Sequence, residues 1–147
     1  MKYTVDASVF VSAAREAEEN HQASLRFLRM LEARGVTVVC PTLVLPECAA
    51  AIARPTGSAA LATELVKLVV SFPGMDLVPL SAGLSTAAAR VASLYRLRGA
   101  DAVYAAVAVE LGAVLVTWDR EMLERCSGVV KTITPEYALR SRSRKGS

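Results

Sequence analysis

Four acidic side chains stand beside strand-like segments that are far apart in the chain. Asp6 ends the run Tyr-Thr-Val-Asp, and Glu47 follows a second apolar run in Pro-Thr-Leu-Val-Leu-Pro-Glu. Asp101 opens the stretch Asp-Ala-Val-Tyr-Ala-Ala-Val, and Asp119 closes Val-Leu-Val-Thr-Trp-Asp. Each acid alone is better explained as a helix cap, which contributes about 1 kcal/mol. The four together are more informative, because helices that follow parallel strands begin at the carboxyl edge of the sheet, where ligands bind.

Asp101 is the acid that is hardest to explain as a solvated helix residue. Before Gly112, the other charge of its helix is Glu110, which falls on the opposite face. Asp101 is therefore expected to point toward the strand ends, beside Val and Ala side chains. A carboxylate there is costly unless it is paired or binds a metal. Pairing with Arg96 or Arg98 is the alternative that the sequence leaves open.

The expected chemistry follows from the donor atoms of this acidic set. Carboxylates a few ångströms apart repel one another by roughly 4 kcal/mol per pair at an effective dielectric near 20. A divalent cation bound between them removes that cost. All-oxygen ligands suit Mg²⁺ or Mn²⁺ better than zinc. His21 is the only histidine, which disfavours a zinc site and a Ser-His-Asp triad. Water activated by a metal is then the natural nucleophile, and phosphodiester hydrolysis is the reaction that such a site supports.

Strand-like and helix-like segments alternate along the chain, which indicates an α/β fold. The strand-like runs are apolar on successive residues, as in parallel strands covered on both faces; they are Tyr3–Val5, Val36–Cys40, Leu77–Leu80, Val114–Thr117 and Val129–Ile133. The helical stretches are Val9–Arg34, Thr42–Phe72, Ala82–Leu111 and Arg120–Arg125, of which the first three are long enough for two helices each. Within the second stretch, Leu61, Leu65 and Leu68 repeat at helical spacing and are expected in the core.

Composition and charge predict one globular domain followed by a basic tail. The chain has 147 residues, 53% of them apolar, with 17 Lys and Arg against 14 Asp and Glu. Four of the basic residues fall in the last eight, so we expect a domain over residues 1–139 and a flexible tail over residues 140–147. Three cysteines without a CxxC pair favour reduced thiols in the cytosol. No uncharged stretch approaches the roughly 20 residues that span a bilayer, so a cytoplasmic protein without membrane contact is expected.

The acid-containing segments resemble the PIN-domain nucleases, most closely the VapC-type ribonuclease toxins of prokaryotic toxin-antitoxin pairs. The matching segments, which together span almost the whole chain, are Val-Asp-Ala-Ser at positions 5–8, Glu47 after Pro41-Thr42, Gly99-Ala100-Asp101-Ala102 and Leu115-Val116-Thr117-Trp118-Asp119. An Asp after a strand is a weak signal by itself. The series Asp, Glu, Asp and Thr-x-Asp in this order is a fairly specific one.

The resemblance implies a fold, a site and partners. The fold is a Rossmann-like three-layer α/β/α sandwich with a mainly parallel five-stranded sheet. The catalytic and metal-binding residues are Asp6, Glu47, Asp101 and Asp119, which hold one or two Mg²⁺ or Mn²⁺ ions. Ser8 and Thr117 match the supporting hydroxyl positions, although Ser8 is also a reasonable helix cap and Thr117 a reasonable strand residue. The expected partners are an RNA substrate, a cognate antitoxin and a second copy of the chain.

Two other classes of function stay open at this stage. A phospho-receiver domain would use a Mg²⁺ site with Thr117 and Lys131, but Asp76 lies at the start of its predicted strand and not at the end, where a phosphoacceptor is needed. A binding module of the same fold would hold an antitoxin or RNA without cutting it. For RNA contacts, Trp118 and Tyr104 are candidates for base stacking but fit a core equally well.

Overall fold

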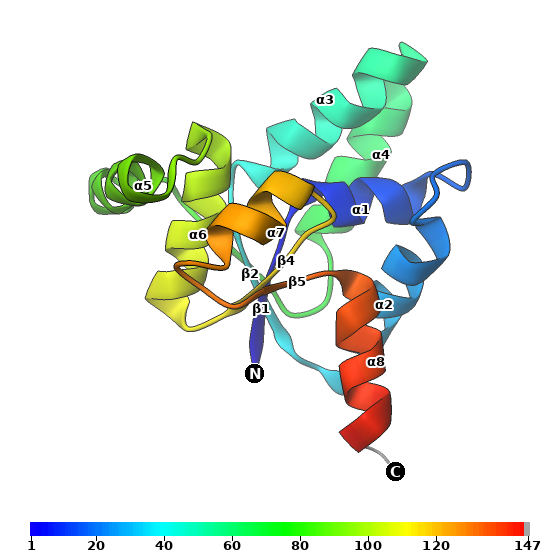
Figure 1. Cartoon of the computed structure of the whole chain (residues 1–147). Helices are drawn as coiled ribbons and strands as arrows, with labels where there is room; N and C mark the ends of the chain where they lie inside the picture. The colour runs from blue at the N-terminus through cyan, green and yellow to red at the C-terminus, as the bar shows by residue number, and fades with distance from the viewer. Residues whose placement is uncertain (146–147) are drawn as a thin grey trace.

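The computed structural model describes residues 1–145, and residues 146 and 147 lie outside the described part. Its centre is a parallel sheet of five strands in the order β3-β2-β1-β4-β5 (Figure 1). The strands are β1 (Lys2–Val5), β2 (Thr37–Pro41), β3 (Met75–Val78), β4 (Val114–Val116) and β5 (Thr132–Ile133). The helices are α1 (Ala7–Ala14), α2 (His21–Arg34), α3 (Val44–Thr56), α4 (Ala59–Val70), α5 (Ala82–Tyr95), α6 (Gly99–Leu111), α7 (Arg120–Cys126) and α8 (Pro135–Lys145).

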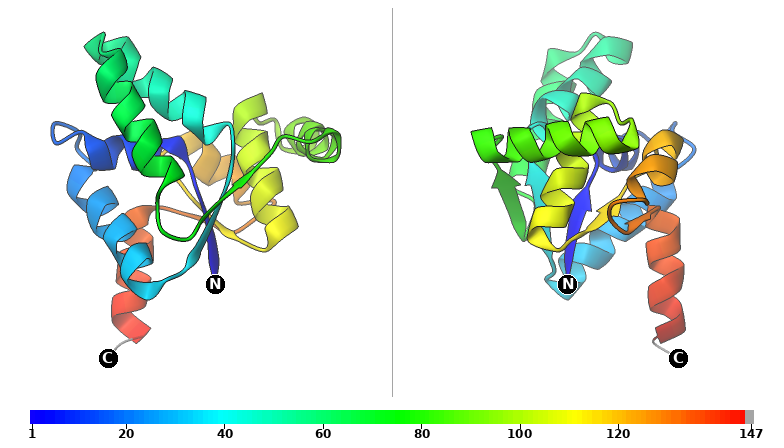
Figure 2. Two further views of the ribbon diagram at one scale, coloured as in Figure 1. Left: turned by 180° about the vertical axis from the view of Figure 1, so that it is seen from behind. Right: turned by 60° about the vertical axis from the view of Figure 1, so that its left-hand side comes forward.

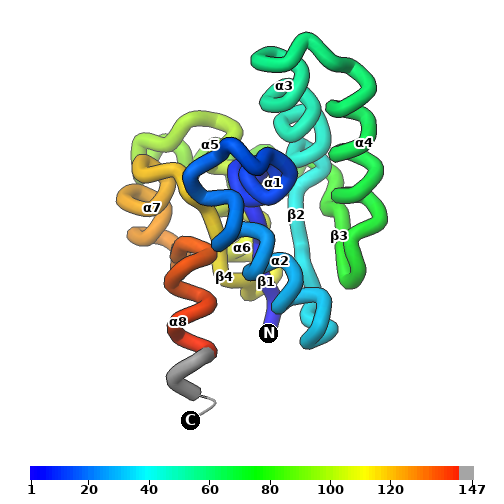
Figure 3. Tube along the Cα trace, turned by 90° about the vertical axis from the view of Figure 1, so that its right-hand side faces the viewer, coloured from blue at the N-terminus to red at the C-terminus, as the bar shows by residue number. Residues whose placement is uncertain are grey.

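Helices cover both faces of the sheet, so the fold is a three-layer α/β/α sandwich, as predicted. Helices α1, α2 and α8 pack together on one face, in front of the strands in Figure 3. Helix α6 packs on β1, β2 and β4 from the other face, with α5 and α7 beside it. Helices α3 and α4 form a hairpin that projects beyond the sheet, which Figure 2 shows from behind. Both faces of the central strands are therefore buried, as their continuous apolar sequences require.

The strand order places a topological switch point between β1 and β4. From β1 the chain moves outward through β2 to β3, and then crosses to β4 on the opposite side of β1. The ends of β1 and β4 stay joined, because the N–H of Asp6 donates to the carbonyl of Val116 at 3.0 Å. In open α/β sheets the crevice at this switch point is where ligands bind. The fold therefore brings Asp6 and the residues after Val116 to the position where a site is expected.

The predicted elements are found with shifted ends. The first three helical stretches each divide into two helices, with breaks near Asn20, Gly57 and Gly99 as expected. The prediction that the α4 leucines all belong to the core is wrong for two of them, since Leu61 and Leu68 are 50% and 65% exposed. Helix α4 is apolar on most sides and packs through its Ala62, Leu65 and Val69 face instead. The three cysteines are buried and free, which agrees with a packing role.

Helix α8 occupies part of the segment that the charge pattern suggested as a tail. Pro135 stands at its first position, where a missing N–H costs nothing, and the hydroxyl of Thr134 accepts from the N–H of Tyr137 at 3.0 Å. Ala138 is buried against the domain. The division between residues 1–139 and 140–147 stays a prediction, and its boundary falls inside this helix. Within residues 1–145, no helix combines the length and the apolar composition needed to cross a membrane.

Gly74 offers a direct test of the turn that leads into β3. Its φ is +80°, and a Cβ there would lie 2.5 Å from the carbonyl oxygen of Val36. Gly35 has a φ of +61° but nothing within 4 Å of the same position. We expect Gly74→Ala to lower the free energy of unfolding by about 2–4 kcal/mol, and Gly35→Ala by about 1 kcal/mol, because only the first adds a backbone clash to the left-handed strain. Urea unfolding measures both, and equal losses would contradict this assignment of the turn.

Candidate active site

A single open cavity of about 520 Å³ at the carboxyl edge of the sheet contains all four predicted acids. Asp6, Glu47, Asp101 and Asp119 all line it, together with the hydroxyl-bearing residues Ser8 and Ser12. The acids come from the end of β1, the first turn of α3, the first turn of α6 and the residue that precedes α7. The structure thus gathers side chains that are up to 113 positions apart in the sequence.

Asp6 is a buried acid whose carboxylate is held by two hydrogen bonds. It caps α1, where one carboxylate oxygen, Oδ2, accepts from the N–H of Ser8 at 3.4 Å. The same oxygen accepts from the buried Thr117 hydroxyl at 2.9 Å. Asp6 itself is 7% exposed. These contacts fix one carboxylate oxygen and orient the group toward the cavity that it lines.

The two predicted hydroxyls connect the end of β1 to the end of β4. Thr117 donates to Asp6 and accepts from the N–H of Asp119 at 3.0 Å. Ser8 accepts from the N–H of Trp118 at 3.1 Å, and its hydroxyl lies 3.5 Å from that of Thr117. Ser8 therefore does not act as the helix cap, because Asp6 does. Both hydroxyls contact the acidic site, as predicted from their positions.

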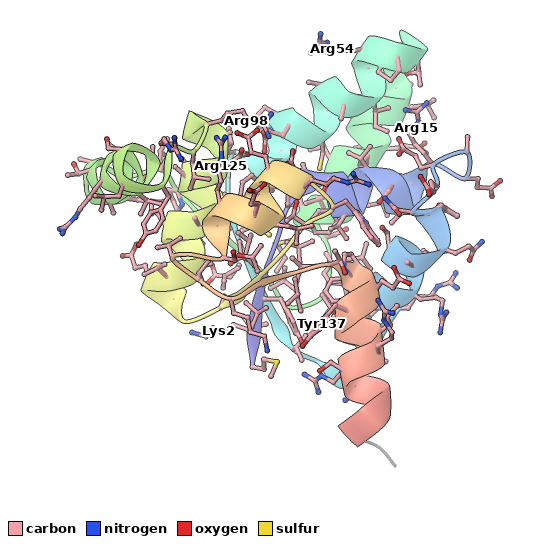
Figure 4. All side chains as sticks on the ribbon, in the orientation of Figure 1. Lys2, Arg15, Arg54, Arg98, Arg125 and Tyr137 are labelled. Carbon is pink, nitrogen blue, oxygen red and sulfur yellow. The ribbon has the colours of Figure 1, made fainter. Side chains whose placement is uncertain are left out.

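Asp101 and Asp119 share one guanidinium. Nε of Arg98 lies 2.9 Å from Asp101 Oδ2, and its Nη2 lies 2.8 Å from Asp119 Oδ2. Asp119 also caps α7, where Oδ1 accepts from the N–H of Met122 at 3.0 Å. The pairing that the sequence left open for Asp101 is therefore present, with Arg98. Arg96 instead uses its carbonyl to accept from Arg125 at 2.7 Å, and Figure 4 shows Arg98 and Arg125 at the same end of the molecule.

Glu47 brings a polar atom into the site that no residue satisfies. Its buried Oε1 makes no hydrogen bond of good geometry among the described residues, and neither does the hydroxyl of Tyr104. That hydroxyl is close enough to Glu47 to lower the pKa of its carboxyl group, against the larger effect of burial. A buried carboxylate oxygen without a partner is costly. Tyr104 is fully buried, so its ring belongs to the core and is not available for base stacking. Trp118 does line the cavity.

Burial and mutual repulsion set the charge states of the acids. Burial raises the pKa of Asp6, although hydrogen bonds from Ser8 and Thr117 oppose the rise. Burial also raises the pKa of Glu47 and that of Asp101, the latter against the effect of Arg98. At Asp119 burial again acts upward, but the N–H of Met122 and the Arg98 guanidinium outweigh it, so the pKa of Asp119 falls. Repulsion from Asp6 raises the pKa of both Glu47 and Asp101, as expected of a shared pocket.

The donor set fits a hard divalent cation in its chemistry. The four acids offer only oxygen ligands, which Mg²⁺ and Mn²⁺ prefer, and Glu47 holds an unpartnered oxygen. Among residues 1–145, no three His, Cys, Asp or Glu side chains stand close enough to form a complete ligand group. The acids therefore line one cavity without closing on a common point, and Arg98 bridges two of them.

Several lining residues were not predicted from the sequence. Glu18 and Asn20 reach the cavity from the loop between α1 and α2. Glu121, in the first turn of α7, is outside the lining but lies 3.8 Å from Nε of Arg98. None of these residues stands at a strand end or at the start of an apolar helix, the signals that singled out Asp6, Asp119 and Asp101. For Glu121 a weaker signal exists, since it stands two residues after Asp119 in Asp-Arg-Glu.

Comparison with known proteins gives a family and several structural relatives. A family model described as PIN domain matches residues 3–127. PAE2754 from Pyrobaculum aerophilum has a TM-score of 0.72 at 25% identity, over 98% of this chain and 90% of that one. VapC20 from Mycobacterium tuberculosis, described as a sarcin-ricin loop cleaving toxin, has a TM-score of 0.72 at 19% identity, over 89% and 98%.

VapBC2 from Rickettsia felis, whose structure was solved bound to a DNA fragment from its promoter, has a TM-score of 0.71 at 14% identity, over 91% of this chain and 98% of that one. No curated protein sequence is significantly similar to the chain. The structural likenesses extend over nearly the whole chain, so the shared fold includes the sheet edge that carries the acids.

The raised carboxyl pKa values predict that the metal-free protein becomes less stable as pH rises above about 4, the ordinary carboxyl value. Between the ordinary carboxyl pKa and the raised pKa of the folded protein, the folded state binds more protons than the unfolded state. The free energy of unfolding therefore falls as pH rises through this window. The pKa of Asp119 is lowered, so this residue makes stability rise with pH, but only below the ordinary carboxyl pKa. Asp6→Asn should raise the melting temperature in EDTA at neutral pH and flatten the slope. Asp76→Asn, at an exposed acid outside the cavity, is the control.

Thermal unfolding in EDTA between about pH 4.5 and about pH 7.5 measures both effects. A wild-type protein that gains stability with pH across this range, or an Asp6→Asn variant less stable than wild type at neutral pH, would contradict the electrostatic description of the site.

Proposed function

Because the chain belongs to the PIN domain family, we propose that it is a metal-dependent endoribonuclease that hydrolyses RNA phosphodiester bonds, and that it serves as the toxin of a type II toxin-antitoxin pair. The observation that carries this proposal is the convergence of four carboxylates in one cavity. Such a cluster is electrostatically unfavourable by itself. It becomes favourable when a divalent cation shares the carboxylate oxygens.

Asp6, Glu47, Asp101 and Asp119 are the residues that would hold one or two Mg²⁺ or Mn²⁺ ions. When bound, such a cation neutralises charge on the scissile phosphate and lowers the pKa of water, which supplies a nucleophile at neutral pH. The chain has one histidine, His21, whose Nδ1 lies 2.9 Å from the carbonyl of Ser12. His21 is absent from the residues that line the cavity, so the acids are the groups that can move protons there.

The hydroxyl residues act as positioning residues in this proposal. Thr117 uses its single proton on Asp6 Oδ2, which leaves Oδ1 of Asp6 free for a ligand. It also fixes the backbone of Asp119 by accepting its N–H. Glu47 lines the cavity and its pKa is raised by burial, so its carboxyl group can accept or release a proton there. Proton transfer by a carboxylate is most efficient when its pKa approaches the working pH.

RNA is the substrate that the comparisons favour. VapC20 shares the fold over nearly its whole length and is described as cleaving the sarcin-ricin loop. The cavity is open to solvent and is lined by Trp118 as well as by the acids. An aromatic ring at such a position is suited to contact a base in a single-stranded or looped RNA. Arg15, which lies 3.5 Å from Glu18, and the exposed Arg120 are candidates for contacts with the RNA backbone.

We infer two protein partners, an antitoxin and a second copy of the chain. The VapBC2 structure supports the antitoxin, because the protein in it that shares the fold of this chain belongs to a two-protein system. The described residues also form two apolar hollows that none of the four acids lines. One, of about 370 Å³, lies among α1, α2 and α4 and includes Phe10, Leu28 and Leu68; the other, of about 410 Å³, includes Leu80, Ala88 and Val103. A cytoplasmic location is the expectation that accompanies these partners.

The two alternative functions make different predictions. The phospho-receiver interpretation has no supporting observation, since Asp76 is exposed near the start of β3 and Lys131 is exposed before β5. A receiver would gain a phosphoryl group on an Asp when incubated with acetyl phosphate and Mg²⁺. A non-catalytic binding module would bind RNA or an antitoxin without cutting RNA, and the cleavage assay below separates it from a nuclease.

We predict that the purified protein cleaves ribosomal RNA in Mg²⁺ or Mn²⁺ and that EDTA abolishes the cleavage. Asp6→Asn and Asp101→Asn should each lower the rate by about 10²–10⁴, since each removes several kcal/mol of transition-state stabilisation by the site. Asp76→Asn should cleave like wild type, because Asp76 lies outside the cavity. Product bands on a denaturing gel measure the rates. Cleavage that persists in EDTA, or that survives both site substitutions, would contradict the proposed function.

A further inference from the structure

Arg98 stands where a cation is needed by two of the four acids. Its Nε and Nη2 contact Oδ2 of Asp101 and Oδ2 of Asp119 at 2.9 and 2.8 Å, and Glu121 adds a third carboxylate at 3.8 Å. Among the described residues, no other basic side chain pairs with Asp101 or Asp119. In this structure the positive charge shared by those two acids is therefore the guanidinium of Arg98.

The local backbone gives no reason of its own for an arginine at this position. Arg98 is the residue that caps α6, but its side chain makes no capping hydrogen bond. A positive charge at a helix N-terminus also opposes the helix dipole. The carboxylates of Asp101 and Asp119 are therefore what holds the guanidinium here. Because the side chain is 58% exposed, it can leave without opening the core.

Arg125 is a nearby arginine that, unlike Arg98, does not pair with an acid of the cavity. It pairs with Glu121 and donates to the carbonyl of Arg96 at 2.7 Å. Arg125 is absent from the lining of the cavity, whereas Arg98 is part of it. The two arginines share Glu121 as a neighbour and differ in their contact with Asp101 and Asp119. They form a matched pair for mutation.

We propose that Arg98 is a built-in counter-cation, which neutralises Asp101 and Asp119 in the metal-free protein and which a divalent cation must displace. The inference rests on the proposed function, since it concerns the same acids. One carboxylate oxygen of each acid is occupied by Arg98, so the cation and the guanidinium compete for those atoms. The apparent affinity for the cation is then reduced by the fraction of molecules in which Arg98 is closed on the acids.

Displacement gives the guanidinium a second role. The side chain remains attached at the mouth of the cavity after it leaves the acids, and its planar fork binds phosphate oxygens well. Besides Glu121, a phosphodiester brought to the site is an anion that the released guanidinium can meet there. Arg98 thus links the two binding events: the cation releases the guanidinium, and the released guanidinium contacts the RNA backbone.

The test is calorimetric titration of the full chain with Mn²⁺ in the absence of RNA, for wild type, Arg98→Gln, Arg98→Lys and Arg125→Gln. We expect Arg98→Gln to bind Mn²⁺ about 3–10-fold more tightly than wild type, because the competing charge is gone. Arg98→Lys should fall between them, since a lysine keeps the charge but not the two-pronged contact. Arg125→Gln should match wild type.

Melting temperatures provide a second readout that does not depend on activity. In EDTA, Arg98→Gln should melt below wild type, because Asp101 and Asp119 lose their counter-charge, and saturating Mn²⁺ should remove most of that difference. Circular dichroism confirms that each variant is folded. RNA binding in Ca²⁺ should be weaker for Arg98→Gln than for Arg125→Gln.

The outcomes separate this inference from the proposed function. A wild-type protein and an Arg98→Gln variant that both fail to bind Mn²⁺ would contradict the proposed metal site. Equal or weaker Mn²⁺ binding by Arg98→Gln, with wild-type binding intact, would overturn the counter-cation role and leave the metal site standing.

Discussion

Repulsion among carboxylates that are crowded at one edge of a sheet is the constraint on which this structure depends. Asp6, Glu47, Asp101 and Asp119 line the same cavity, and repulsion and burial together disfavour the charged forms of the first three. The surrounding residues stabilise the acids in different ways. A threonine hydroxyl and a backbone N–H hold Asp6, a helix N-terminus holds Asp119, and one arginine neutralises two acids at once. Glu47 keeps a buried oxygen that accepts no hydrogen bond of good geometry within residues 1–145.

The fold explains why the acids meet although the sequence separates them. Each follows or opens an element at the carboxyl edge of a parallel sheet, and the strand order puts the switch point between β1 and β4. Asp6 ends one of these strands, and Thr117 to Asp119 follow the other. The hydrogen bonds among Asp6, Ser8 and Thr117 close the gap between the two strand ends. Membership of the PIN domain family agrees with this arrangement.

The sequence is sufficient to predict the sheet and the acids but not every neighbour. Asp6 and Asp119 are visible because strands of apolar β-branched residues end at or just before them. The sequence offers Arg98 as one of two possible partners for Asp101, since spacing along a helix start does not decide which arginine folds back. Leu61 and Leu68 are misplaced because α4 is apolar on most sides, and tertiary contacts with other elements choose the buried face. Helix α8 continues through residues 140–145 and packs against α2, which charge patterning does not report.

The central claim is that the four carboxylates form one binding site for a divalent cation. The most direct measurement is a crystal structure of the protein grown with Mn²⁺, with the ion located by its anomalous scattering. We expect an anomalous peak in the cavity, within coordination distance of Asp6 and at least one other of the four acids, with the Arg98 guanidinium turned away from Asp101 and Asp119. An empty cavity at saturating Mn²⁺ with Arg98 still bridging those two acids, or an ion bound only elsewhere on the molecule, would contradict it.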